Sequence, residues 1–315
     1  MPTVRVFAPA TIANIGPGFD VLGVAVEGLG DVVEARLLDG RPGTVLIERI
    51  EGDGGRLPRE ADHNTAGIAA RETLKLLGNP DRGVALTLYK GLPLSSGLGS
   101  SAASAAAACW AVNLLFGAPL SKQDLLPAAL AAEAHVSGWH ADNVGPALLG
   151  GFVLIRSYRP LDLIRLPASP NMLFVLAMPE YELPTQKARG VVPTTVSLQQ
   201  HVANSGNLGA LVAGICTGDT RLLGRAVQDE IVEPARAPLI PGFQQVKEAA
   251  LEAGAYGCSI SGAGPTVFAV TDDEGRAGRI AEAMRAAFAS AGLKSRTHVG
   301  RVDAEGARVE ILRNK

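Results

Sequence analysis

Apolar and polar positions in the first half of the chain follow two periods, each typical of a different element. Short apolar or alternating runs predict strands, whereas longer Ala- and Leu-rich segments predict helices. We expect strands over residues 4–7, 31–38, 43–51, 84–90 and 151–156, and helices over 66–77, 101–116 and 124–136. Residues 8–23 have too many glycines and prolines for a helix and too many apolar residues for a free loop. We expect a shaped, partly buried loop there.

Capping and breaking residues mark two of these helices. Asn64 is most simply the N-cap of helix 66–77, which ends where Gly78-Asn79-Pro80 follows. Asp124 is expected to cap helix 124–136, because Pro127 then lies in the first turn, where a missing N–H is harmless.

The second half predicts a layer of strands and helices. Residues 157–170 are Pro-rich and charged, so we divide the chain into domains 1–160 and 161–315. Beyond the boundary we expect a strand over 172–178, helices from 182 to about 232, a break at 233–236 and a helix over 243–253. A strand pair follows over 258–261 and 266–270, then a helix over 273–291 and strands near 295–302 and 308–312. The expected fold class is α+β.

Composition narrows the function classes. A 315-residue chain with 47% hydrophobic and 4% aromatic residues can bury a large core of Ala, Val and Leu. Its net charge of −2 gives no electrostatic case for nucleic acid or an anionic membrane. The one long uncharged apolar region, 92–118, carries serines and glycines and is interpreted as a buried helix. Three scattered cysteines predict neither disulfides nor zinc, which fits a reduced cytoplasm.

Residues 93–103 lie between a predicted strand and a predicted helix. Gly97 and Gly99 let the backbone turn its N–H groups toward a ligand, and the helix N-terminus favours an anion. A turn without a ligand is one alternative. A dinucleotide fingerprint is another, but it requires an acidic residue about 20 positions later, and residues 117–120 contain none. The third is a phosphate loop without the Walker lysine, which needs a divalent cation and cationic side chains from elsewhere.

Several polar residues could supply the metal ligand and the cationic side chains that such a phosphate loop needs. Glu133 is the only carboxylate on the apolar last turns of its helix, and His140, Asp142 and Asn143 stand between a helix end and an apolar strand. For Asn14 and Asp20, a turn that organises its own backbone is an equal alternative to a binding role. Lys187 and Arg189 oppose the dipole of the helix they begin, so a nearby anion would explain them.

Three segments together, 9–20, 93–102 with its Gly-Leu-Gly-Ser-Ser-Ala core, and 261–266, resemble the three motifs of the GHMP kinases in order and spacing. The Asn-Ile-Gly-Pro-Gly-Phe-Asp form of the first motif is similar to the members of that family that phosphorylate L-homoserine. The same holds for residues 140–143, 187–189, 233–236 and 240–243. The segment between Glu133 and His140 is one residue shorter than the family pattern leads us to expect.

The resemblance implies an N-terminal domain of ribosomal-protein-S5 type, a ferredoxin-like C-terminal domain, and ATP with Mg²⁺ between them. The residues implied in nucleotide binding are Asn64, near the adenine, and Pro93, Ser95, Ser96, Gly97, Leu98, Gly99, Ser100, Ser101 and Ala102. Ser101, or alternatively Ser100, would hold Mg²⁺ with Glu133. Lys187 would face the phosphates.

The implied acceptor, L-homoserine, is a zwitterion. Arg189 and Arg236 suit its carboxylate, and Asp20 and Asp142 suit its ammonium group. Asn14, His140 and Asn143 could orient the reacting hydroxyl, and Gly262 is assigned to the same subsite by resemblance. The resemblance implies a kinase that acts largely without a catalytic base, by direct attack of a well-placed hydroxyl. Whether Asp142 or His140 takes the proton stays open.

Two other functions stay open at this point. One is a related kinase with a sugar, mevalonate-type or shikimate-like acceptor, and the other is a catalytically silent protein of the same fold. The family resemblance also suggests a homodimer.

Overall fold

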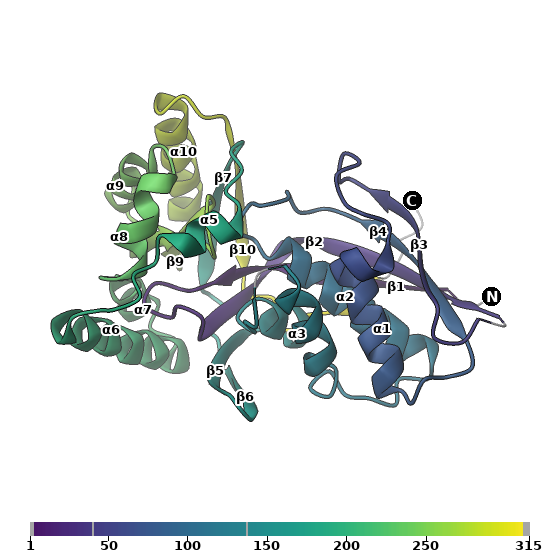
Figure 1. Ribbon diagram of the computed structural model, residues 1–315. Coiled ribbons are helices and arrows are strands. Elements are labelled where there is room, and N and C mark those ends of the chain that lie inside the picture. Colours follow the sequence, from purple (N-terminus) through teal and green to yellow (C-terminus); the bar gives the residue numbers. More distant parts are fainter. Residues whose placement is uncertain (1–2, 40, 137, 311–315) are drawn as a thin grey trace.

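The computed structural model describes residues 3–39, 41–136 and 138–310, which form two lobes that lie side by side (Figure 1). One lobe holds the strands and helices of the first half of the chain, and the other holds the helices and the sheet that residues 173–301 form. Among these residues, none of the helices has the length and apolar character that a membrane span requires.

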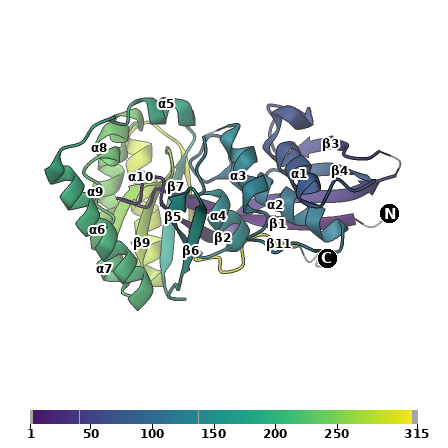
Figure 2. The ribbon, with the colours of Figure 1, turned by 60° about the horizontal axis from the view of Figure 1, so that its bottom comes forward.

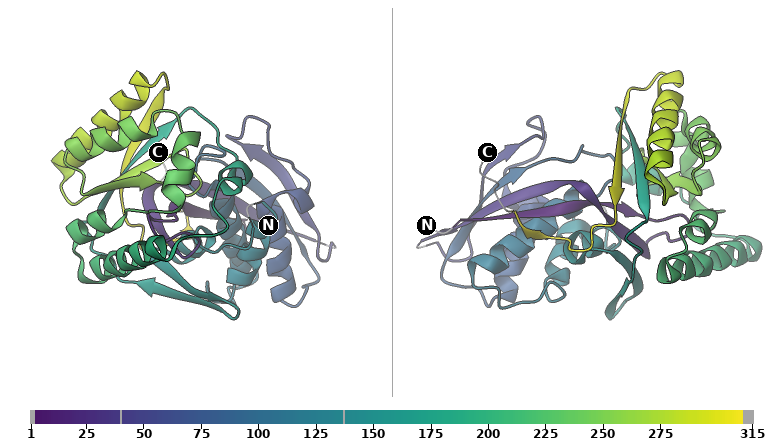
Figure 3. Two further views of the ribbon diagram at one scale, coloured as in Figure 1. Left: turned by 60° about the vertical axis from the view of Figure 1, so that its left-hand side comes forward. Right: turned by 180° about the vertical axis from the view of Figure 1, so that it is seen from behind.

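A long antiparallel hairpin forms the backbone of the first lobe and reaches toward the second (Figure 3). Its strands are β1 (Thr3–Ala13) and β2 (Leu22–Leu38). The predicted loop over 8–23 was therefore wrong at both ends, because β1 continues to Ala13 and β2 already begins at Leu22. The strand continues past Pro9 because the register shifts between Pro9 and Ala10, and a bulge is a place where proline is tolerated in a sheet.

Within the described residues, the first sheet has seven strands in the order β11-β1-β2-β4-β3, with β5 paired to β2 and β6 to β5. The remaining strands are β3 (Val45–Glu51), β4 (Gly83–Tyr89), β5 (Phe152–Tyr158), β6 (Leu161–Leu166) and β11 (Arg308–Val309). The sheet thus includes strands on both sides of residue 160, where the sequence suggested a boundary. Of the last predicted strand, residues 311–312 lie outside the described residues.

Helices α1 (Thr65–Leu76), α2 (Ser100–Leu115) and α3 (Leu126–Ala134) lie together against one side of this sheet (Figure 2), followed by the short α4 (Val144–Leu149). Asn64 caps α1 as predicted, since its Oδ1 accepts from the N–H of Ala66 at 3.0 Å. The prediction that Asp124 caps the next helix is wrong. Its carboxylate accepts from the N–H and hydroxyl of Ser121 in the preceding turn, and α3 begins only at Leu126.

The second sheet has four strands in the order β10-β7-β9-β8, and each neighbouring pair is antiparallel. They are β7 (Leu173–Pro179), β8 (Gly257–Ile260), β9 (Val267–Thr271) and β10 (Ser295–Arg301). Helices α9 (Phe243–Glu252) and α10 (Glu274–Ser290) pack against it. Strand, helix, two strands, helix and strand is the order of a ferredoxin-like layer, as predicted.

Between β7 and α9 the chain forms α5 (Thr185–Gly190), α6 (Leu198–Thr217), α7 (Thr220–Ala226) and α8 (Val232–Arg236). The described residues also contain two short 3₁₀ helices, Ala61–His63 before α1 and Ala237–Leu239 after α8. The predicted break at 233–236 is wrong, because these residues are helical. Asp229 accepts from the N–H groups of Val232 and Glu233, which satisfies the first turn of α8.

The two lobes share one hydrophobic core. Along β7, Leu173 and Val175 face α9 and α10, whereas the alternate residue Phe174 belongs to the core cluster that continues into the first lobe. Phe174 lies between Phe152 and Phe268, with ring centroids 6.1 Å away on each side. The cavity described below is therefore bordered by two lobes that are packed together.

Candidate active site

The predicted phosphate loop connects β4 to α2. Ser95 (φ +52°), Gly97 (φ +80°) and Gly99 (φ +67°) adopt left-handed conformations at alternate positions. Within the described residues, the backbone N–H groups from Ser95 to Ser101 donate no hydrogen bond to the protein. Alternating conformations of this kind turn successive N–H groups inward, and the N-terminus of the 16-residue helix α2 adds its dipole. The loop is thus shaped to receive an anion.

Segments distant in sequence hold this loop in place. The N–H of Thr11, in the first motif, donates to the carbonyl of Leu98 at 3.1 Å. From the third motif, the Ser261 hydroxyl donates to the carbonyl of Gly97 at 2.7 Å. A Cβ on Gly97 would lie 2.4 Å from the carbonyl oxygen of Ser261, so only glycine permits this approach.

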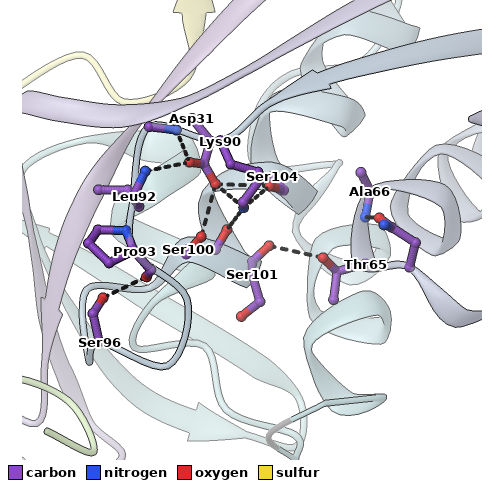
Figure 4. Close-up of polar contacts among 12 residues, drawn as sticks. Asp31, Thr65, Ala66, Lys90, Leu92, Pro93, Ser96, Ser100, Ser101 and Ser104 are labelled. Atoms are coloured by element: carbon purple, nitrogen blue, oxygen red, sulfur yellow. Dashed lines mark hydrogen bonds and ion pairs between the residues drawn. The ribbon is translucent and has the colours of Figure 1, made fainter. Parts of the chain in front are cut away.

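The side chains of the two consecutive serines point to different partners. Ser100 donates to the buried carboxylate of Asp31 at 3.2 Å (Figure 4). Ser101 instead donates to Oε2 of Glu133 at 2.9 Å. Ser101 and Glu133 both border the cavity and offer only oxygen atoms. The described residues contain no cluster of three or more His, Cys, Asp or Glu ligands. Two oxygen ligands suit Mg²⁺, which usually takes most of its ligands from water and substrate phosphates.

The loop opens onto a cavity of about 290 Å³ between the lobes. Other parts of its lining come from the first motif, the segment 140–143, and the helices α5 and α8. The polar residues that these segments contribute are Asn14, His140, Asp142, Asn143, Thr185, Arg189 and Arg236.

An ion pair joins Arg189, which lines the cavity, to Asp20, which is not among the lining residues. Both terminal nitrogens of Arg189 donate to the carboxylate of Asp20, at 2.9 and 3.1 Å, and Nδ1 of His140 lies 3.3 Å from the same carboxylate. These hydrogen bonds raise the pKa of Arg189. Nε of Arg189 is buried and has no hydrogen-bond partner among the described residues. This Nε is therefore a buried guanidinium donor that the protein leaves unused.

Arg236 is 2% exposed and is held by carbonyl groups. Its Nε donates to Ala188 at 3.1 Å and its Nη1 to Gly262 at 2.8 Å. Among the described residues, no carboxylate forms an ion pair with it. Burial, with Arg189 nearby, lowers the pKa of Arg236 to about 10, so it stays charged at neutral pH. Both guanidiniums lie 5.2 Å from the ring centroid of Phe19, which stabilises two like charges close together.

Asp142 is 3% exposed, and burial raises its pKa to about 7. The carboxylates of Asp20 and Glu133 contribute to this raised pKa. Asp142 is thus electrostatically coupled both to Asp20 and to Glu133. Burial also lowers the pKa of His140, which favours the neutral imidazole. Both groups can therefore accept a proton near neutral pH.

Comparison with known proteins identifies the family. Residues 64–151 match the family model of the GHMP kinases N terminal domain, and residues 211–290 match that of the GHMP kinases C terminal region. Homoserine kinase of Arabidopsis thaliana is 54% identical over 98% of this chain and 84% of its own length. The chain belongs to the GHMP kinase family. Members of this family use ATP.

Two further relatives match this GHMP kinase over nearly their whole length. Homoserine kinase of Chlorobium phaeobacteroides is 47% identical over 98% of this chain and 100% of its own. The crystal structure of homoserine kinase from Cytophaga hutchinsonii superposes with a TM-score of 0.94 at 48% identity, and covers 98% of each chain. The predicted fold is confirmed, with both family domains present.

Most residues that the sequence suggested for this GHMP kinase site lie at one cavity. Those that line it are Asn14, Asn64, Ser95, Ser96, Gly97, Gly99, Ser100, Ser101, Glu133, His140, Asp142, Asn143, Arg189, Arg236 and Gly262. Asp20, Pro93, Leu98 and Ala102 do not line it. Leu98 and Ala102 are buried beneath the loop, and the carbonyl of Pro93 accepts from the hydroxyl of Ser96 at 2.8 Å. Lys187 is exposed and outside the lining.

Several asparagines of the GHMP kinase have structural partners. Asn14 accepts from the N–H of Asp20 at 2.8 Å, which is the turn that the sequence left as an alternative. Asn64 both caps α1 and donates to the carbonyl of Pro58 at 2.9 Å. Asn143 accepts from the hydroxyl of Thr11 at 2.7 Å. These contacts fix the side chains at the cavity wall.

Residues of this region that sequence reasoning missed include Lys90, Thr185 and Tyr158. Lys90 and Thr185 line the cavity. Tyr158 accepts from the N–H of Ala141 at 3.0 Å and donates to the carbonyl of Asp20 at 2.8 Å, so it joins the first motif to the segment 140–143. Tyr158 lies in the stretch interpreted as a domain boundary, and no local pattern marks it.

Proposed function

We propose that the protein transfers the γ-phosphoryl group of ATP to the side-chain hydroxyl of L-homoserine and forms O-phospho-L-homoserine, a step of threonine biosynthesis. The observation that supports this acceptor is the charge pattern next to the phosphate loop. Two guanidiniums, of Arg189 and Arg236, and two carboxylates, of Asp20 and Asp142, lie within one electrostatically coupled group. An amino acid carries the complementary pair of charges.

The Asp20–Arg189 pair supports a mode of binding by exchange. Before the acceptor arrives, these two charges neutralise each other. A zwitterion brings its carboxylate to the guanidiniums and its ammonium to Asp20, so each protein charge exchanges one partner for another of the same sign. A sugar offers neither charge and would leave the pair unchanged. Their mutual pairing explains why both charges can be partly buried without the substrate.

Magnesium belongs to the same proposal. Ser101 and Glu133 would hold the ion, and when bound it neutralises charge on the transferred phosphate. The serines' different partners favour Ser101 over Ser100 as the ligand. The loop amides and the dipole of α2 orient the phosphates, which is the main contribution that phosphoryl transfer requires from a protein.

For the proton, the structure favours Asp142 over His140. Asp142 is coupled to Glu133 near the donor phosphates and to Asp20 near the acceptor, which is where the reacting hydroxyl must lie. With its pKa at about 7, about half of Asp142 is ionised at neutral pH and can take the hydroxyl proton. His140, beside Asp20, then orients the acceptor.

An acceptor panel tests the proposal. In a coupled ADP-release assay, L-homoserine should be used, whereas galactose, shikimate and mevalonate should not. 4-Hydroxybutanoate lacks the ammonium and 3-amino-1-propanol lacks the carboxylate, so each should lose at least 100-fold in kcat/KM. Comparable use of 3-amino-1-propanol would contradict carboxylate recognition by the arginines, and no activity with any alcohol would favour a silent protein of this fold.

We also propose that the protein is a homodimer in the cytoplasm. Helix α6 has 20 residues without an Asp, Glu, Lys or Arg, and it exposes Leu198 (77%) and Val202 (62%). An exposed, uncharged helix face is typical of a contact between copies. Light scattering should give twice the chain mass, and Leu198→Glu with Val202→Glu should give the monomer. The three free cysteines support the reduced compartment.

A further inference from the structure

A buried carboxylate lies directly beneath the phosphate loop. Asp31, on β2, is 1% exposed. Its Oδ1 accepts from the backbone N–H groups of Gly91 and Leu92, each at 3.0 Å. Its Oδ2 accepts from the hydroxyls of Ser100 at 3.2 Å and Ser104 at 2.9 Å (Figure 4). No part of the first or third motif contributes to this group.

These four contacts connect the two ends of the loop. Gly91 and Leu92 are where the chain leaves β4, and Ser100 and Ser104 are in the first two turns of α2. One carboxylate therefore fixes the point at which the loop begins relative to the point at which it ends. Between these points the loop has no regular structure of its own and relies on such contacts for its shape.

Lys90 completes the group. Its ammonium forms an ion pair with Asp31 and donates to the carbonyl of Ser100 at 3.0 Å and the hydroxyl of Ser104 at 2.6 Å. An ammonium has three N–H donors, and all three are used. The side chain is 2% exposed although the residue borders the cavity. In this arrangement its charge is cancelled by Asp31, and its donors are directed at the protein.

We propose that Asp31 is a positioning residue for nucleotide binding: with Lys90 it ties the start of the phosphate loop to the first turns of α2 and sets the direction of the loop amides. The inference rests on the proposed role of this loop in binding ATP. Asp31 touches no part of the lining that an acceptor would reach, so its effect should be confined to the nucleotide.

The test compares Asp31→Asn with Asp303→Asn. Asp303 is an apt control because it is 2% exposed, accepts from the N–H groups of Glu305 and Gly306, and pairs with Arg308 at 2.7 Å, outside the cavity. MgADP affinity is measured by calorimetry without any acceptor, and KM for ATP and for homoserine by steady-state assay. We expect Asp31→Asn to weaken MgADP binding and raise KM for ATP by about 10- to 100-fold, with KM for homoserine within threefold. Asp303→Asn should lower Tm and leave both constants within twofold.

The double variant Asp31→Asn/Lys90→Met separates positioning from stability. It leaves no unpaired buried charge, so its Tm should exceed that of Asp31→Asn. It still lacks the contacts to Ser100, so MgADP binding should stay at least 10-fold weak. Recovery of both Tm and affinity would show that the group only stabilises the fold, and would overturn the proposal. So would wild-type-like affinity in a folded Asp31→Asn. If Asp31→Asn does not fold, the double variant decides.

Because calorimetry uses MgADP alone, a wrong acceptor assignment leaves this test intact. A wild-type protein that does not bind MgADP would instead overturn the nucleotide site and the inference with it.

Discussion

The nucleotide end of the cavity is built mainly from backbone, whereas the acceptor end is built from charged side chains. At the loop, left-handed residues and a helix N-terminus present amides, and the ion pair beneath them is internally neutral. At the proposed acceptor end, Asp20, Arg189 and Arg236 carry the charges and pair with one another or with carbonyls. A backbone site serves any ligand with phosphates, so specificity for the acceptor must come from the side chains.

Asp142 is coupled to charged residues at both ends, and its substitution should have the largest effect on the catalytic rate. Asp142→Asn removes the proposed proton acceptor, and kcat should fall by about 10²- to 10⁴-fold. In the wild type, kcat should fall as the pH drops through about 7, because Asp142 becomes protonated. In the variant this limb should disappear from the pH–rate profile. A variant that loses only acceptor affinity, with kcat intact, would limit Asp142 to binding.

The same substitution should stabilise the fold. The pKa of Asp142 is raised from 3.8 to about 7, so the folded state keeps a proton that the unfolded state releases between these values. Stability is therefore lost as the pH rises through this window, by an amount of roughly 4 kcal/mol at most. Urea unfolding at pH 8 should show Asp142→Asn to be more stable than wild type, with little difference at pH 4. Equal stability at both pH values would contradict the raised pKa.

Removing an arginine should affect the acceptor end alone. Arg236→Ala and Arg189→Ala should each cost about 2–5 kcal/mol in kcat/KM for homoserine, because a buried charge loses its partner. KM for ATP should change little. Arg236→Lys keeps the charge without the planar fork and should recover only part of the loss. Equal losses for both substrates would point to a folding role instead.

The adjacent serines provide a matched pair at the nucleotide end. Ser101→Ala should raise the Mg²⁺ concentration for half-maximal rate by about 10-fold, because one oxygen ligand is lost. Ser100→Ala should leave that concentration unchanged, since its hydroxyl faces Asp31. Glu133→Gln should behave like Ser101→Ala. A metal titration that shifts with Ser100→Ala and not with Ser101→Ala would reverse the assignment.

The smallest effect should come from Asn64, because its side-chain oxygen and nitrogen both already form hydrogen bonds within the protein. Asn64→Ala removes the cap of α1 and should cost about 1 kcal/mol of stability. Asn64→Asp keeps the cap acceptor and should cost less, although it loses the bond to Pro58. KM for ATP should stay within threefold in both. A much larger rise in KM would mean that Asn64 contacts the adenine directly.

Sequence reasoning reached the nucleotide end more easily than the acceptor end. The phosphate loop is local, because glycines, strand and helix follow one another within a short stretch. Arg189 and Asp20 were both selected, but their mutual pairing joins positions 169 residues apart and no periodicity signals it. Lys90 was interpreted only as the end of a strand. Its partner Asp31 lies 59 residues earlier, and no local pattern connects the two. Pro9 and Asp124 misled the predictions because a bulge and a neighbouring serine outweighed their usual local preferences.

Strand β11 gives the chain a particular order of assembly. Val309 pairs with Val6 of β1, and Ala307, just before the strand, is fully buried in the core of the first lobe. During synthesis, the first sheet can therefore be completed only after the whole second lobe has left the ribosome. Until then the β1 side of the sheet is an open edge, exposed to pairing with other chains.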